Sequence, residues 1–181
     1  MPTTKSLLRE YFEQLAGLPC WNVKAEYGSW LSLNFGTPHL ETREGNPDAK
    51  IGSLKRRAVF VTGEFRVWVE MGAWEILENG KRIYHSDQSR AYLRRAASRL
   101  DSQKISVVAL LGDEKTTVFS FDQGSQLHVR SVETADADEG QWHVYCHGNC
   151  LTLLANWTLE YGPSKGTKRR QITANAAIYA A

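Results

Sequence analysis

This chain has few cysteines and lacks long apolar runs and an excess of charge of one sign, and each of these features excludes a class of protein. Its three cysteines are odd in number and too few for a disulfide framework, so we expect reduced thiols and a cytoplasmic location. No run approaches the ~20 apolar residues of a membrane-spanning helix. Lys5, Arg9 and Glu10 interrupt the N-terminal stretch, which therefore lacks the pattern of a signal peptide.

The balance of charge and the motif content argue against two common functions. The formal net charge is only +2, so the whole chain has no electrostatic bias toward nucleic acid. No nucleophile elbow, phosphate-binding P-loop or dinucleotide-binding glycine pattern is present in the sequence. We therefore favour a protein without catalysis of its own, and we predict no cofactor.

Two stretches have the periodicity of an amphipathic helix. The first covers residues 4–16, with Thr3 or Thr4 as its N-cap and Gly17 at its end. The second covers residues 87–101, with Ser86 or Asp87 as its N-cap. The predicted apolar faces consist of Leu7, Leu8, Tyr11, Phe12 and Leu15 in the first helix and Tyr92, Leu93, Ala96, Ala97 and Leu100 in the second.

The rest of the chain alternates with a period of two, which is typical of short strands. We predict one hairpin around Thr62-Gly63 and another around Asn79-Gly80, a pair that tolerates positive φ. Further turns are predicted at residues 27–29, 134–140 and 162–168. The predicted strands are residues 21–25, 30–35, 39–43, 57–61, 64–71, 74–77, 81–84, 105–111, 116–121, 126–132, 141–146, 151–155, 157–161 and 171–179.

Close strand spacing with only two helices predicts an α+β fold that is mainly antiparallel β. More than about ten strands in one twisted sheet tend to curl or split, so we expect two packed sheets or a partly open barrel. We expect a single domain over residues 1–181. Its parts are an N-terminal helix (1–17), a first β region (21–85), a mid-chain helix (87–101) and a second β region (104–181).

Two tryptophans lie on the polar side of the strand alternation. Trp30 shares its side with Ser32 and Asn34, and Trp68 stands between Arg66 and Glu70. Because side chains alternate across a strand, both indoles should leave the sheet opposite the main core. Our favoured interpretation is that the N-terminal helix covers and buries them. The alternative is an exposed aromatic patch, with Arg66 and Glu70 beside it, that binds a protein partner.

Two further clusters are candidate sites. The second helix presents four arginines opposite Leu93, which offers a face for phosphates or an acidic partner, although a solvated helix face explains them as well. These arginines are Arg90, Arg94, Arg95 and Arg99. Thiols and imidazoles gather in one short run that is only a weak metal candidate, because a structural zinc site draws on two separated ligand pairs. This run contains His143, Cys146, His147 and Cys150, and we predict no metal there.

One order of residues resembles a group of small bacterial β-rich proteins without an assigned activity. The resemblance covers about residues 27–155. It is carried by Trp30-Leu-x-Leu-x-Phe-Gly-x-Pro-His-Leu-x-x-Arg-Glu44, Arg57-x-Val-x-Val-x-Gly-Glu-Phe-x-x-Trp-Val69, Thr117-x-Phe-x-Phe-Asp122 and Gln141-Trp-x-x-Tyr145. By loose analogy, it implies an immunity-type or inhibitor protein and adds no catalytic residue.

The sequence therefore leaves three functions open. Our first expectation is a bacterial protein, monomeric or homodimeric, that binds a macromolecular partner and has an immunity-like or inhibitor-like role. The second is a small-ligand-binding β-barrel or an enzyme that uses His39, His85 or His143. The third is binding of nucleic acid through the arginine face of the second helix.

Overall fold

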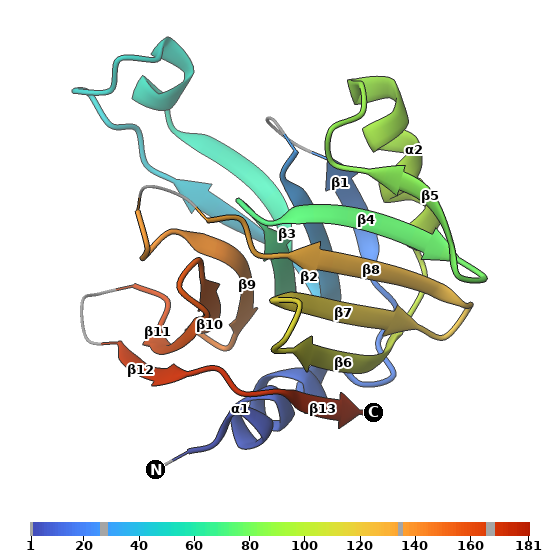
Figure 1. Cartoon of the computed structure of the whole chain (residues 1–181). Coiled ribbons are helices and arrows are strands. Elements are labelled where there is room, and N and C mark those ends of the chain that lie inside the picture. Colours follow the sequence, from blue (N-terminus) through green and yellow to red (C-terminus); the bar gives the residue numbers. More distant parts are fainter. Residues whose placement is uncertain (1, 26–28, 134–135, 166–168) are drawn as a thin grey trace.

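The computed structural model contains two antiparallel sheets packed face to face, and it describes residues 2–25, 29–133, 136–165 and 169–181 (Figure 1). The predicted α+β class and two-sheet alternative are confirmed. In spatial order, the seven-stranded sheet comprises β1 (Trp21–Ala25), β2 (Leu31–Arg43), β3 (Ala58–Val69), β9 (Gly140–Cys146), β10 (Asn149–Leu154), β11 (Thr158–Pro163) and β12 (Arg170–Thr173). The six-stranded sheet comprises β13 (Ala177–Ala180), β6 (Ile105–Leu111), β7 (Thr116–Phe121), β8 (Ser125–Arg130), β4 (Ala73–Glu78) and β5 (Lys81–His85).

The two helices close the margins of this sandwich and do not lie across an outer face. Helix α1 (Thr4–Phe12), continued by a short 3-10 turn at Glu13–Leu15, packs against β13 and β9, which belong to different sheets. Its Phe12 ring lies 5.9 Å from Phe119 and 6.4 Å from Trp142, between centroids. Helix α2 (Arg90–Leu100) packs against β1 and β5, the edge strands of the two sheets.

This placement overturns the predicted cover of the tryptophans. The apolar face of α1 is buried, but against the core between the sheets. Trp30 and Trp68 are therefore half-buried and not beneath the helix. An amphipathic helix can bury its apolar stripe at the open end of a sandwich as well as on a sheet face, and the sequence pattern does not distinguish the two.

The N-caps of the helices were only partly predicted. Thr3 caps α1 in a reciprocal capping box with Ser6. Helix α2 begins later than predicted, with Ser89 as its N-cap, because the Ser86 hydroxyl instead accepts a hydrogen bond from the Trp74 amide. Tyr92, which the helical periodicity places on the apolar face of α2, is exposed.

The predicted hairpin at Thr62-Gly63 is wrong, because β3 continues straight through it. Gly63 pairs with Pro38 across the sheet, next to a bulge in β2. A Cβ on Gly63 would lie 2.5 Å from the Phe35 carbonyl oxygen, so the glycine serves a close approach of two backbones and not a turn. The hairpin at Asn79-Gly80 is confirmed, with φ of 51° and 71° at its two central residues.

The C-terminal strand and the two β regions also differ from the prediction. The predicted strand 171–179 is two strands, of which β12 extends the seven-stranded sheet and β13 joins the six-stranded sheet. The first β region supplies strands to both sheets, as does the second. One continuous cluster of buried apolar side chains fills the space between the sheets. The predicted turn residues 27 and 28, residues 134 and 135, and residues 166–168 lie outside the described part of the chain.

Strands β2 and β3 run beyond the rest of the molecule as a two-stranded ribbon, which Figure 1 shows projecting at the upper left. We call residues 38–63 the arm. Strand β1 pairs with β2 only as far as Asn34, and β9 pairs with β3 only from Phe65. A short 3-10 turn, Gly52–Lys55, lies near its tip.

Candidate functional site

Cross-strand register gathers the first candidate residues on the outer face of the seven-stranded sheet. One row across neighbouring strands runs Ser32, Trp68, His143 and Thr152, and the adjacent row runs Asn34, Arg66, Tyr145 and Cys150. The intervening positions, such as Val67 and Val144, are buried in the core. The alternation therefore predicted the outward direction of Trp68 correctly.

The two tryptophans and Arg66 form an aromatic and cationic cluster. Trp30 meets Trp68 edge to face, with ring centroids 5.3 Å apart. The Arg66 guanidinium lies 4.7 Å from the Tyr145 ring and 5.6 Å from the Trp68 ring. Such geometry is favourable for a cation above an aromatic face. Glu70 belongs to the same face but points its carboxylate toward His143.

A groove of about 370 Å³ adjoins this cluster and reaches the base of the arm. Its aromatic walls are Trp30, Trp68 and Phe60, and no carboxylate is found among the described residues that line it. Three cations line it, namely Lys24, Arg43 and Arg66. The groove therefore presents positive charge beside apolar surface, which suits an acidic ligand.

Arg66 is one of three described residues with a buried polar side-chain atom that lacks a hydrogen bond, beside Gln103 and Ser131. Its Nε atom is buried and has no hydrogen-bond partner among the residues that the structure describes, nor does its guanidinium form an ion pair with any of them. A buried donor without a partner is costly, so a bound acceptor would be stabilising there. Arg66 also lines a second hollow of about 500 Å³ that includes His39 and Glu64.

His143 is held by hydrogen bonds on both ring nitrogens. Its Nε2 lies 2.8 Å from Glu70 Oε2, and its Nδ1 lies 2.9 Å from Thr152 Oγ1. Burial acts to lower the pKa of His143, but the nearby Cys150 thiol and the Glu70 carboxylate outweigh it, so the pKa lies above its ordinary value. The Cys150 sulfur lies 3.4 Å from Thr152 Oγ1 and extends this series of polar contacts.

The order Glu70, His143, Thr152, Cys150 has the components of a cysteine-based catalytic site, but its geometry does not suit catalysis. The Cys150 sulfur lies beside Thr152 and the His143 imidazole, but Cys150 is fully buried, so no substrate reaches its sulfur. A nucleophile must reach its substrate and its base. We therefore infer that this series of hydrogen-bonded side chains has a structural role and supports Trp68 and Tyr145 on the outer face.

The structure does not gather the residues of the weak metal candidate. His143 and Cys150 belong to the outer face, whereas Cys146 points inward, where its thiol contacts the Tyr11 carbonyl oxygen. Burial raises the pKa of Cys146 to about 12, so it is a protonated thiol near neutral pH. His147 lies in the following turn, with its ring 4.9 Å from Phe65. In the described ranges, no three metal-ligating side chains are grouped to hold an ion.

The arginines of α2 are exposed, and two of them have partners. Arg99 forms an ion pair with Glu78 at 2.8 Å, and the Arg95 guanidinium lies 5.6 Å from the Tyr92 ring. Arg90 and Arg94 complete this exposed face of the helix. The pairing of Arg99 leaves less positive charge free for phosphates than the sequence indicated.

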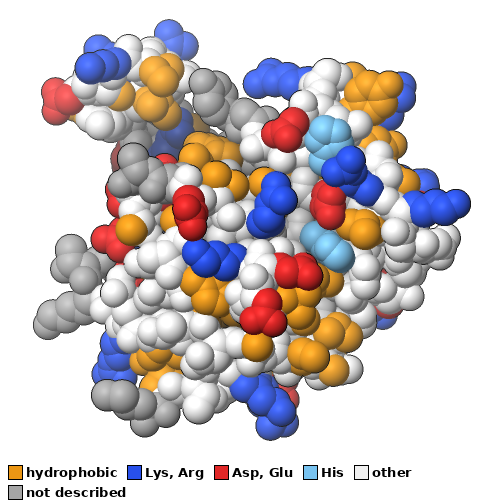
Figure 2. Space-filling view, viewed as in Figure 1, with side chains coloured by type: hydrophobic (Ala, Val, Ile, Leu, Met, Phe, Trp, Pro, Cys, Tyr) orange, Lys and Arg blue, Asp and Glu red, His pale blue; other side chains and the backbone are white. Residues whose placement is uncertain are grey.

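The arm carries an apolar surface that sequence analysis did not single out. Leu40, Val59 and Val61 share the face that is buried in the rest of the sheet, yet their exposed fractions are 70%, 57% and 49%. The reason is that the arm extends past the six-stranded sheet, so nothing in the described chain covers this face (Figures 1 and 2). Phe60 on the opposite face and Ile51 near the tip are exposed too.

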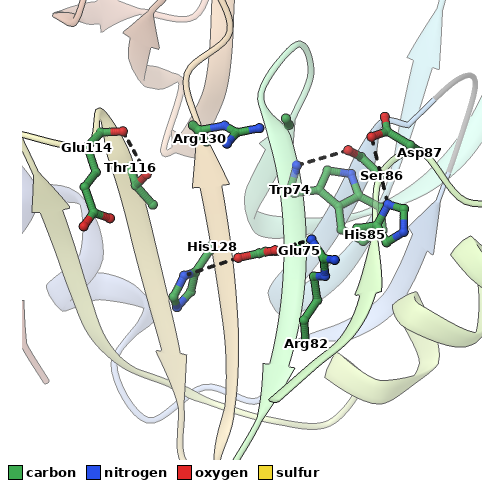
Figure 3. A pocket seen from close by; sticks show the side chains of 11 residues that line it. Trp74, Glu75, Arg82, His85, Ser86, Asp87, Glu114, Thr116, His128 and Arg130 are labelled. Carbon is green, nitrogen blue, oxygen red and sulfur yellow. Dashed lines mark hydrogen bonds and ion pairs between the residues drawn. The ribbon is translucent and has the colours of Figure 1, made fainter. Parts of the chain in front are cut away.

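A different hollow, of about 460 Å³, lies on the outer face of the six-stranded sheet (Figure 3). We call it the polar hollow. Figure 2 shows charged and histidine side chains mixed over this face. Glu75 lies at its centre, 3.5 Å from Arg82 and 4.0 Å from His128. Burial lowers the pKa of His128, more than the charge of Glu75 raises it.

No known protein family, curated protein or solved structure matches this chain. None of the helices in the described ranges combines the length and apolar character needed to cross a membrane.

Proposed function

We propose that this chain acts by binding another protein through the arm and the adjoining groove, without catalysis of its own. The partner has an apolar patch that covers Leu40 and Val59, and acidic side chains that enter the groove. An immunity-like or inhibitor-like role in the bacterial cytoplasm is the specific form that we favour. In this role the arm would occupy a working surface of the partner.

The exposed apolar face of the arm carries this proposal. Of the eleven large hydrophobic side chains that are exposed in the described chain, six lie in the arm, so apolar exposure is concentrated there. Concentrated apolar surface on a folded protein marks an interaction site. A two-stranded ribbon is only marginally stable alone, so a partner that covers the arm would also stabilise it.

The free edges of the arm offer a second mode of contact. Neither the β2 edge beyond Phe35 nor the β3 edge before Phe65 is paired within the described ranges. An extended segment of a partner can add to such an edge through backbone hydrogen bonds. The arm lacks a buried charge that would prevent this pairing, although Glu44 and Arg57 form an ion pair near its tip.

The groove supplies the electrostatic part of the proposal. Lys24, Arg43 and Arg66 line it, and carboxylates of a partner would compensate their charge. Arg66 matters most, because its guanidinium lies over the Tyr145 ring and its buried Nε has no acceptor among the described residues. Arginine and tryptophan are the residue types that most often dominate the binding energy at protein interfaces.

Site-specific photo-crosslinking tests this proposal in the cell that produces the protein. A photoreactive residue placed at Val59 should give one discrete adduct with a second protein, and Arg66→Gln in the same chain should abolish it. The matched control places the photoreactive residue at Ile178, which is equally exposed but lies on β13. Identical adducts from both positions would show non-specific contact and contradict the proposal.

Two other outcomes of the crosslinking experiment would replace the proposed protein partner with a different one. An adduct between two copies of this chain, with a dimer mass in light scattering, would make the arm a homodimer interface. An adduct that disappears on nuclease treatment, with binding that weakens steeply as salt rises, would indicate nucleic acid. Either result overturns a heterologous protein partner.

A further inference from the structure

The polar hollow arises on the outer face of the six-stranded sheet because small side chains there are surrounded by longer ones. Ala73, Ser86 and Thr116 are small and leave space, whereas longer side chains surround them. The cross-strand row Thr116, Arg130 and Ala73 borders the row His128, Glu75 and His85. A hollow of this size is within the range of small-molecule sites.

The charges at the centre of the hollow neutralise one another. Glu75 Oε2 lies 3.5 Å from the Arg82 guanidinium, and Glu75 Oε1 lies 4.0 Å from His128 Nδ1. The other nitrogen of His128 lies 3.3 Å from Gln126 Oε1. These polar groups therefore interact with one another and form the floor of the hollow.

The charged side chains at the rim of the hollow have few or no such interactions with the described residues. The Arg130 guanidinium has no hydrogen bond, ion pair or ring contact with any described residue, and the same holds for the Glu114 carboxylate. Asp87 has only a long contact, 4.0 Å, with His85 Nδ1. Figure 3 shows Arg130 on one side of the space and Asp87 with Ser86 on the other.

We propose that the polar hollow binds a free α-amino acid. Its carboxylate would bind the Arg130 guanidinium, whose planar donors match a carboxylate. Its ammonium group would bind the Asp87 carboxylate, next to the Ser86 hydroxyl and the open nitrogen of His85. A ligand with a single charge would leave one side of the rim uncompensated, so the presence of both signs selects a zwitterion. This site is separate from the arm and does not depend on the proposed function.

Histidine ring signals in nuclear magnetic resonance spectra report directly on the hollow. Titration with each proteinogenic amino acid should shift the His85 and His128 signals with a Kd below ~1 mM for at least one of them. The signals of His39, which lies on the other sheet, should stay in place. Propionate and propylamine each carry one of the two charges and should bind at least ~10-fold more weakly.

Two variants test the assigned roles, and a third serves as control. Arg130→Gln and Asp87→Asn should each weaken amino-acid binding at least ~10-fold, because each removes one charge of the pair. Neither side chain supports the fold, since Arg130 has no partner in the described chain and Asp87 is 91% exposed. Arg170→Gln removes an exposed arginine on β12 and should leave the affinity unchanged.

Three results would overturn the proposal. The first is the absence of any shift with every amino acid at ~10 mM. The second is equal affinity for propionate, which would make the hollow a simple anion site. The third is unchanged affinity in Arg130→Gln or Asp87→Asn, with circular dichroism used to confirm that each variant is folded.

Discussion

The hydrogen bond between His143 and Glu70 gives a stability prediction whose size depends on pH. Glu70→Gln removes the charge of the acceptor, which lies 2.8 Å from Nε2, and keeps the shape of the side chain. The pair is shielded from solvent, because the exposed fraction is 12% for the His143 side chain and 27% for that of Glu70. A charge-assisted hydrogen bond contributes ~1.5–3 kcal/mol, so the free energy of unfolding should fall by ~2 kcal/mol at pH ~6.

The pH dependence follows from the raised pKa of His143. Burial alone would lower that pKa, and the contacts with Cys150 and Glu70 raise it above the ordinary value. A raised pKa in the folded state gives stability that is complete below the unfolded pKa of ~6.5 and is lost as the pH rises through the folded pKa. The difference between wild type and Glu70→Gln should therefore shrink from pH ~6 to pH ~9.

Urea unfolding of both proteins at the two pH values measures this difference. Glu64→Gln is the matched control, because Glu64 lies on β3, which ends just before Glu70, and its carboxylate has no ion pair with a described residue. A double-mutant cycle with His143→Gln isolates the interaction between the two side chains. A difference of equal size at both pH values, or a coupling energy near zero, would refute the reasoning.

Three further predictions concern packing and are checked by thermal or urea unfolding. Gly63→Ala should cost more than ~2 kcal/mol, because its Cβ would meet backbone atoms of β2, whereas Gly52→Ala should be neutral because its Cβ meets open space. Thr3→Ala should cost ~1 kcal/mol through loss of the capping box. Val67→Ala should cost ~2 kcal/mol at a buried position, and Val59→Ala in the exposed arm should cost less than ~0.5 kcal/mol.

Local patterns were sufficient to predict most elements and the direction of several side chains. Asn79-Gly80 fixed a hairpin because both residues favour positive φ, and alternation placed Trp68 opposite the core. Gly63 misled the prediction for a physical reason. A glycine that permits close approach of two strands looks, in sequence, like a glycine in a turn.

The candidate sites depended on long-range arrangement that local patterns do not contain. Glu70 and His143 meet only through the pairing of β3 with β9, 73 residues apart in the chain. The apolar arm is exposed because the six-stranded sheet ends before it does, and the length of that sheet cannot be predicted from Val59 or Leu40. The apolar run 58–61, between a polar loop and Gly63, is the signal in the sequence that could have pointed to the arm.

The role of the arm as the binding face is most directly tested by the affinity for the partner identified by crosslinking. Calorimetric titration with Val59→Lys should show affinity at least ~30-fold weaker than wild type, because a charge replaces an apolar contact at the interface centre. Ile178→Lys, an equally exposed substitution on β13, should bind within ~2-fold of wild type. Equal affinity of wild type and both variants would contradict the assignment of function to the arm.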